Sequence, residues 1–539
     1  MSRFRALLAQ RVRRDRVQLV LWTAGTALLA YSSFVGVSES YGTEQDRTSL
    51  LAAALANPVI LLFRGLPSGT DEGAFMVFLI FPWLAFLAAM MSTFLAVRHT
   101  RAEEETGRAE VVGATPAGRL LPAGATAVEG LAANAVLGTL VALAYLAVGL
   151  PVEGSLLAGF AVGAVGVTFL GVGLVAAQLM RTARSANSLA VWITVGTLVL
   201  AGIGNAIGTP SDDLTRMESS WLTWLSPFGW GENTRAFDEN AWWPALVCLG
   251  VGLALAVVSL ALTSARDVGE GFVAERHGRE HASAVLSSTT GLVWRLTRGA
   301  VLGWAVGGLL TGLLSTSLAS IVAEVGASNP SVEQILDRIA GGGDITQATV
   351  TVFFTMLGIL AACAAVQVVC HARQEEAHGT AEPVLAAPVA RVRWLADYLV
   401  VALLAIVLVV AAAVVGAAAG IAGQDGDWDL MRDVLVTGGG QVVAASVFLA
   451  ITALIFVIAP RLTIGLGWTL VLLAMTLGLF GPLFGFPEWV TNLSPVAVAP
   501  VVEGDDVDLA GLWWLVAATG AGAALSLGLM QRRELAPAG

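Results

Sequence analysis

Two charged loops carry the residues whose types and spacing could do chemistry. With one fixed shift of 272 residues, eleven positions of segment 98–119 are identical in segment 370–391. The candidates are Glu103, Glu104, Gly107, Glu110 and Pro116 in the first copy, and Glu375, Glu376, Gly379, Glu382 and Pro388 in the second. Acids followed by glycine, small residues and proline predict a helix, a break and a turn. We predict that both loops dock on a partner protein; the alternative is a solvated loop that only reverses the chain.

The other reactive side chains form no recognisable site. The three cysteines and five histidines have no zinc or disulfide spacing, and no Ser-His-Asp arrangement can be specified. All 29 basic residues are arginine, so the chain cannot carry an ordinary Walker A sequence, whose lysine contacts the phosphates. We therefore predict a chain that is not an enzyme, with no catalytic residue, metal or cofactor of its own. ATP chemistry, with its Mg, has to come from another polypeptide.

The composition predicts a membrane protein. Of the 539 residues, 56% are hydrophobic and 13% charged, with a mean hydropathy of +0.77. Because soluble proteins carry roughly 25% charged residues, a soluble multidomain enzyme and a disordered chain are both excluded. The net charge of −11, without basic stripes, predicts no nucleic-acid partner.

The elements that position the loops are apolar segments long enough to span a bilayer, which needs about 20 residues. We expect about twelve, near 17–37, 74–97, 125–150, 155–180, 188–208, 243–264, 299–323, 347–370, 396–422, 434–459, 462–482 and 509–530. The fold class predicted is an all-α polytopic membrane protein. With both termini cytoplasmic, the inner segments hold 23 of the 29 arginines, which predicts that orientation in the cell (plasma) membrane.

The loops belong to a wider duplication. The tripeptide Leu-Ser-Pro at 225–227 recurs at 493–495 with a shift of 268. Six spans per copy predict two parallel six-helix repeats, related by an axis along the membrane normal. The expected domains are a first half at 1–265, a cytoplasmic linker with a second amphipathic segment at 266–298, and a second half at 299–539. The first sixteen residues are expected to form an amphipathic helix on membrane lipids.

The sequence E-E-x-x-G-T-A-E-x-x-x-A-x-P-x-x-R at 375–391 resembles the loop between spans two and three of the ABC type-two permease family. The Leu-Ser-Pro tripeptides resemble that family too, whereas Arg108 replaces its usual threonine. The fused two-half form is similar to actinobacterial efflux permeases for polyketide antibiotics, of the tetronasin-resistance type. The resemblance implies the transmembrane permease of an ATP-driven exporter. ATP and Mg would be bound by a separate ATP-binding cassette ATPase, which we expect in two copies per copy of this chain.

The outer segments before spans six and twelve are rich in tryptophan. An interfacial aromatic belt is the ordinary interpretation; the resemblance implies short re-entrant helices capping an exit path. The outer gate or exit candidates are Ser226, Pro227, Arg235, Ser494 and Pro495.

Two other functions fit twelve spans in two halves: an ion-coupled secondary multidrug carrier, and a scaffold or sensor without transport. Ion coupling needs ionisable residues deep in the membrane. Here Glu129 and Asp397 are expected near the inner ends of their spans, and Glu324 near an outer end. The scarcity of ionisable residues in the middle of the spans favours transport driven by energy from a partner protein over ion coupling. Apolar spans rich in glycine and alanine favour a lipophilic or amphipathic small-molecule substrate.

Overall fold

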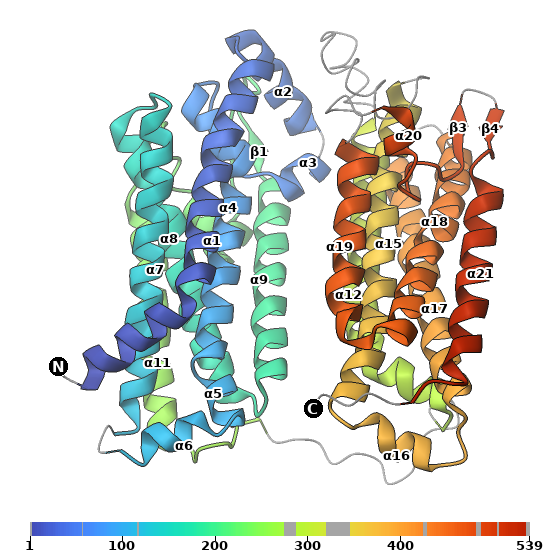
Figure 1. Ribbon diagram of the computed structural model, residues 1–539. Helices are drawn as coiled ribbons and strands as arrows, with labels where there is room; N and C mark the ends of the chain where they lie inside the picture. Colours follow the sequence, from blue (N-terminus) through green and yellow to red (C-terminus); the bar gives the residue numbers. More distant parts are fainter. Residues whose placement is uncertain are drawn as a thin grey trace. The chain divides into compact units, whose positions relative to one another are not determined.

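The computed structural model describes residues 3–56, 58–115, 118–273, 287–319, 345–423, 428–480, 487–503 and 506–534. The chain forms two compact units, Met1–His277 and Gly278–Gly539. Among the described residues, twelve helices are long and apolar enough to cross a membrane, and each unit contains six of them (Figure 1). The prediction of an all-α polytopic membrane protein is confirmed. Glu324 lies outside the described residues.

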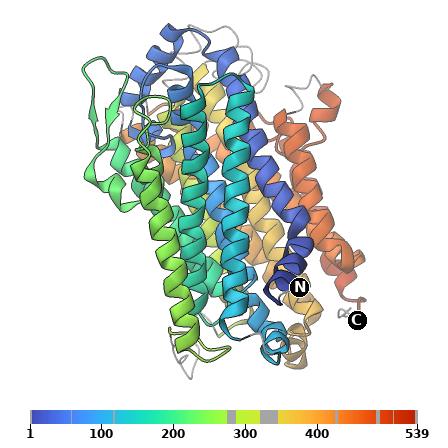
Figure 2. The ribbon, with the colours of Figure 1, turned by 90° about the vertical axis from the view of Figure 1, so that its left-hand side faces the viewer.

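The first unit is a bundle around one central helix. Its spans are α1 (Arg3–Ser40), α4 (Glu72–Arg98), α7 (Leu120–Ala147), α8 (Val152–Leu179), α9 (Ala183–Ala206) and α11 (Trp243–Ala265). Helix α8 packs against α4, α7 and α11, and most of its residues are buried. Glycines allow this approach, because a Cβ on Gly159 would lie 2.3 Å from the Gly138 carbonyl oxygen. Figure 2 shows α1, α7 and α11 running along this unit.

Short elements gather at the two ends of the first unit. Helices α5 (Arg101–Glu105) and α6 (Arg108–Gly113) form one end, here called the loop end (Figure 1). The other end, the far end, holds α2 (Glu44–Ala56), α3 (Pro58–Phe63), the antiparallel pair β1 (Thr209–Pro210) and β2 (Met217–Glu218), the 3-10 helix η1 (Trp221–Leu225) and α10 (Pro227–Glu232). The expected amphipathic helix is helical, and it continues directly into the first span as α1.

The second unit has its own six spans. These are α12 (Thr289–Ser317), α15 (Ile345–Ala377), α17 (Arg391–Ala422), α18 (Leu430–Ile458), α19 (Thr463–Met475), which continues as a π-helical turn over Thr476–Phe480, and α21 (Leu512–Met530). Helices α12 and α17 pack closely, since a Cβ on Gly312 would lie 1.8 Å from the Ala413 carbonyl oxygen. The short elements are α16 (Ala381–Ala386), the 3-10 helix η3 (Pro460–Leu462), α20 (Glu488–Thr491) and the antiparallel pair β3 (Val501–Glu503) and β4 (Asp506–Asp508).

Candidate functional site

The duplicated glycines break both loops in the same way. Gly107 lies between α5 and α6 with φ = 72°, and Gly379 lies between α15 and α16 with φ = 72°. A positive φ of this size is left-handed backbone, which glycine adopts without the steric penalty that a Cβ imposes. Each loop is thus a helix, a left-handed glycine and a short second helix.

In the first unit the loop is fastened to the ends of two spans by Glu104. Arg266, the first residue after α11, donates from both Nη atoms to the Glu104 carboxylate at 2.5 and 3.0 Å. Its Nε donates to Gln178 Oε1 at the end of α8, at 2.6 Å. Arg101 also pairs with Glu104, at 2.8 Å, and donates to the Ala177 carbonyl oxygen. The loop, α8 and α11 are therefore joined by one charged network.

The second unit repeats this arrangement with Glu376. Arg533, just after α21, donates to both Glu376 oxygens at 2.6 and 2.8 Å. Its guanidinium lies over the Phe456 ring of α18, 4.6 Å from the ring centroid. Arg391 donates to the Arg533 carbonyl oxygen, as Arg119 does to that of Arg266. The Arg266–Glu104 pair uses two guanidinium nitrogens and so fixes orientation as well as distance, whereas Arg533 holds both Glu376 oxygens through Nη2. Each loop is thus fastened to its own unit by an arginine–carboxylate pair.

Several acids proposed for docking are thus engaged within the chain. Glu103 pairs with Arg11 and Arg14, both at 3.1 Å, and Glu375 accepts from the Tyr398 hydroxyl at 2.6 Å. The exposed side chains of the loops include Glu105, Arg108 and Glu110 in the first copy, and Gln374, His378, Glu382 and Pro388 in the second. Pro116 lies outside the described residues. We call the exposed residues of each loop its rim. A partner that binds a loop would contact this rim, because Glu103, Glu104, Glu375 and Glu376 are engaged within the chain.

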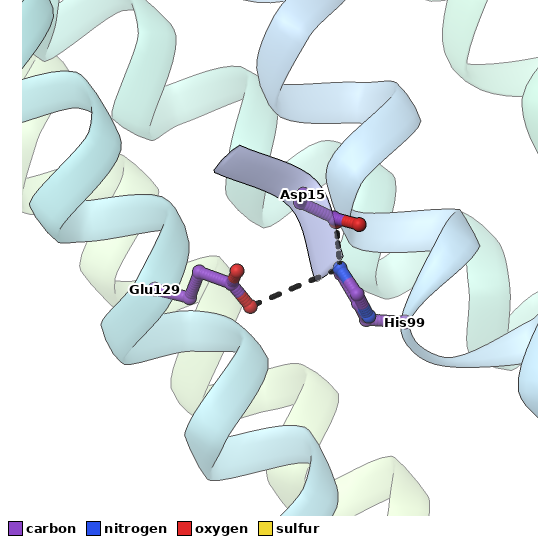
Figure 3. Close-up of side chains that lie close together, drawn as sticks. All are labelled: Asp15, His99 and Glu129. Atoms are coloured by element: carbon purple, nitrogen blue, oxygen red, sulfur yellow. Dashed lines mark hydrogen bonds and ion pairs between the residues drawn. The ribbon is translucent and has the colours of Figure 1, made fainter. Parts of the chain in front are cut away.

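A second cluster lies beside the first loop, at the loop end of the first unit. His99 follows α4, and its Nε2 faces Asp15 of α1 and Glu129 of α7 (Figure 3). All three side chains are buried. Sequence spacing did not reveal this group, because the three residues come from three separate helices. One signal was available: Asp15 is the one acid among the first 38 residues, and it stands between arginines.

The serine and proline of both Leu-Ser-Pro tripeptides are buried in the structure: Ser226, Pro227, Ser494 and Pro495. The Ser226 hydroxyl donates to the Thr197 carbonyl oxygen of α9 at 2.7 Å and accepts from the Phe228 amide at the start of α10. The Ser494 hydroxyl donates to the Ala474 carbonyl oxygen of α19 at 2.9 Å. In both units the serine fastens the segment before the last span to the fifth span.

Arg235 likewise holds structure together at the far end. Its side chain is 5% exposed; it pairs with Glu218 at 3.0 Å and Glu239 at 3.7 Å and donates to the Met217 carbonyl oxygen at 3.1 Å. Nearby, the Glu232 carboxyl accepts from Asn205 Nδ2 at 2.6 Å. Burial raises the pKa of Glu232 to about 8, since desolvation penalises the charged form.

One apolar pocket of about 530 Å³ opens on the first unit between α7, α8 and α11. Leu143, Phe160 and Val167 line it together with glycine and alanine residues, and no charged side chain contributes to the lining. Such a surface accommodates hydrocarbon or aromatic groups, because no charge has to be desolvated there.

Two comparisons with known proteins cover both units. The family described as "Multidrug efflux system permease Rv1217c, C-terminal domain" matches residues 4–262 and 286–533. The chain is also 34% identical over 535 residues to the multidrug efflux system permease protein Rv1217c of Mycobacterium tuberculosis (strain ATCC 25618 / H37Rv). That alignment covers 98% of this chain and 94% of the relative.

Proposed function

The chain belongs to the family of the multidrug efflux system permease Rv1217c, and from that membership we propose that it is the transmembrane permease subunit of an ATP-driven exporter. Its cargo would be lipophilic or amphipathic compounds, among them antibiotics of the polyketide class. The observation that supports ATP hydrolysis by a partner as the energy source is the duplicated loop. Each unit presents a left-handed glycine next to an acid that an arginine from the end of the last span holds in place.

The proposal assigns ATP hydrolysis to a separate ATP-binding cassette subunit. The chain contains no lysine with which to build a Walker A site, so ATP and Mg would be bound by that partner. Loop residues 98–119 and 371–391 would each insert into a groove on one ATPase copy. Because Glu104 and Glu376 fasten the loops to the spans, a movement imposed on a loop rim would reach α8, α11, α18 and α21 directly.

The cargo class follows from the surfaces available within the spans. The described pocket between α7 and α8 is apolar, and the spans are rich in glycine and alanine. A lipophilic compound enters such a surface from the bilayer without losing hydrogen bonds to water. A sugar or an inorganic ion would lose its hydration there without compensating contacts.

The rival function, an ion-coupled carrier, requires ionisable groups midway across the membrane. The acid in α7, Glu129, is within the first ten residues of that helix, and Asp397 is within the first seven of α17. Both are therefore close to the ends that carry the loops. We also propose that these ends and both termini face the cytoplasm of the cell, since the predicted inner segments hold 23 of the 29 arginines.

Transport in inverted membrane vesicles tests this function. Vesicles from cells expressing the chain together with its ATPase should accumulate a lipophilic antibiotic when ATP is added, and a protonophore should leave accumulation unchanged. Vesicles containing the chain alone should accumulate none. Accumulation driven by an imposed proton gradient without ATP would instead establish the ion-coupled carrier.

A further inference from the structure

Three helices bring their ionisable groups together at the loop end of the first unit. Asp15 comes from α1, His99 from the end of α4 and Glu129 from α7, and each residue is at most 3% exposed (Figure 3). One donor atom from each, Asp15 Oδ2, His99 Nε2 and a Glu129 oxygen, lies within 4.8 Å of the others. His99 Nε2 is 3.8 Å from Glu129 Oε2 and makes a close contact with Asp15 Oδ2.

Glu129 is the member of the cluster with both side-chain oxygens left without a hydrogen bond among the described residues, although both are buried. Asp15, by contrast, has Arg98 at 3.0 Å and Arg14 at 3.6 Å on its other oxygen, Oδ1. Because a buried carboxylate without partners is strongly disfavoured, a cation placed between Asp15, His99 and Glu129 would stabilise the Glu129 carboxylate.

The arginines around the cluster pair with Glu103 and Asp15 and leave Glu129 without an arginine partner among the described residues. Glu103, Asp15 and Glu129 are buried or nearly so, whereas Arg11 is the arginine among their neighbours that is fully enclosed. It donates to Glu103 and to Thr126 Oγ1. Arg14 and Arg98, whose side chains are 34% and 38% exposed, pair with Glu103 and Asp15 at the edge of the cluster. Three arginines thus face three carboxylates, and Glu129 is the carboxylate with which none of the three forms an ion pair among the described residues.

His99 is oriented to act as a ligand. Its Nδ1 faces Glu103 Oε1 at 3.6 Å. Without an ion, the Nε2–H donates to Asp15 Oδ2. An ion bound by Nε2 would replace that proton, and the proton of the neutral imidazole would then lie on Nδ1, which faces Glu103. A carboxylate behind a histidine is the usual support of a metal-ligating imidazole. Arg98 plays the corresponding part for Asp15, because it occupies Oδ1 and leaves Oδ2 for an ion.

The second unit provides an internal comparison. At a shift of 268, Glu129 corresponds to Asp397, whose Oδ1 accepts from the Thr290 hydroxyl at 2.5 Å and pairs with Arg393 at 3.2 Å. A protein donor and an arginine thus compensate the acid of the third span there. In the first unit neither is present on Glu129 among the described contacts, and a histidine and an aspartate converge on it instead.

We propose that Asp15, His99 and Glu129 bind one divalent transition-metal ion of the Zn²⁺ or Co²⁺ class. Imidazole and carboxylate ligands suit these ions, and three protein ligands leave a position for water. Metal–ligand distances are about 2.0–2.2 Å, so small side-chain rotations bring donors within 4.8 Å onto one ion. A polar cavity of about 100 Å³, lined by His99, Glu103 and Arg266 among others, adjoins the cluster. The ion would cross-link α1, α4 and α7 beside the first loop.

Metal analysis of the purified full-length chain tests the site. The chain, stripped with a chelator and dialysed against Zn²⁺ or Co²⁺, should retain one ion per polypeptide. Glu129→Gln and His99→Gln should each weaken retention at least tenfold, and bound Co²⁺ should show visible absorption that both variants lose. Asp397→Asn is the matched control at the corresponding acid of the second unit and should retain one ion.

Unfolding of the stripped proteins separates loss of the site from misfolding. Stripped Glu129→Gln should unfold at a higher temperature than the stripped parent, because the substitution removes an uncompensated buried charge. Added Zn²⁺ should raise the unfolding temperature of the parent and leave that of the variant unchanged. Retention of less than a tenth of an ion per polypeptide by the parent would overturn the proposal. In that case a proton, and not a metal ion, would compensate the charge of Glu129. Equal retention by the parent and both variants would overturn it as well.

Discussion

The carboxylate of Glu104 is held by Arg266, a residue 162 positions further along the chain, at 2.5 and 3.0 Å. The corresponding acid of the second unit, Glu376, is held by Arg533 across 157 positions. Each pair lies within its own unit and joins the loop between the second and third spans to the end of the sixth span. A loop fastened in this way cannot move independently of its bundle, and a coupling element needs that property.

Reversing one charge of the Glu376–Arg533 pair should be costly, and reversing both should restore much of the loss. Arg533→Glu leaves two buried carboxylates together, so we expect destabilisation of about 3 kcal/mol or more and loss of ATP-driven efflux. Adding Glu376→Arg restores opposite charges. Thermal unfolding of the purified chain and vesicle transport measure both effects. Arg532→Ala, at an exposed neighbouring position, is the control and should behave as the parent. A double variant as defective as the single one would contradict a coupling role for the pair.

The exposed rims of the loops should determine binding of the ATPase. Glu110→Arg and Glu382→Arg change exposed acids, so the chain should fold normally. We expect the partner to meet these acids with basic groups, so each substitution would bring like charges together and the pair of changes should weaken binding about tenfold. Affinity for the ATPase and substrate-stimulated hydrolysis are the measurements. Glu153→Arg, an exposed acid at the far end of the first unit, is the matched control. Unchanged affinity in the double loop variant would argue against docking through these rims.

Alanine at either loop glycine should distort the loop by its backbone conformation alone. Gly107 and Gly379 both have φ = 72°, and nothing lies within 4 Å of a Cβ added at either position. The cost of about 1–2 kcal/mol per site therefore comes from left-handed backbone. Reduced coupling between hydrolysis and efflux in Gly379→Ala is the expected result. Gly528→Ala in α21 has equal space and no positive φ, so it should stay fully active. Equal loss in both variants would point to the span surface instead.

Much of this architecture could be predicted from the sequence, because long apolar segments have few alternatives to spanning helices. The helix ends were less predictable. The expected span 347–370 ends with its apolar residues, whereas α15 continues to Ala377. Gln374, Glu375 and Glu376 are good helix formers in water, and the helix stops only before Gly379.

The site was predictable only in part, for a physical reason. The repeated pattern singled out Glu103, Glu104 and Gly107, but it could not show which way the acids point. That depends on Arg11 and Arg266, which lie about 90 and 160 residues away along the chain. Glu104 and Glu376 anchor their own loops, and their contact with a partner stays a prediction. The sequence likewise could not show that Ser226 and Ser494 donate to backbone carbonyls, or that Arg235 pairs with Glu218 and Glu239; their place at an exit stays a prediction.

Glu232 should make the first unit less stable as the pH rises. Burial raises the pKa of this carboxyl to about 8, against about 4.5 for an exposed glutamate. The folded chain thus binds the proton more tightly than the unfolded chain. The stabilisation is complete below pH 4.5 and is lost as the pH rises towards 8. Glu232→Gln keeps a neutral group beside Asn205, so its unfolding temperature should fall less between pH 5.5 and 8.5. Glu239→Gln, at a half-exposed neighbour, should keep the parent's pH dependence. The same dependence in the Glu232 variant would contradict this assignment.

One copy of the chain should bind two copies of one ATPase. An ATP-binding cassette exporter ordinarily pairs two permease halves with two ATPases, and this chain contains six candidate spans in each of its two units. Each unit has its own loop with the same left-handed glycine and the same anchored acid, so each offers one docking position. The exposed residues differ, with Arg108 in one loop and His378 in the other, but the shared frame allows one ATPase to fit both.

Native mass measurement of the detergent-solubilised complex should give one permease to two ATPases. Glu382→Arg should increase the fraction of particles that carry one ATPase, because it weakens the second docking position and leaves the first loop intact. Two permease chains per particle, or one ATPase with the unmodified chain, would contradict the fused arrangement.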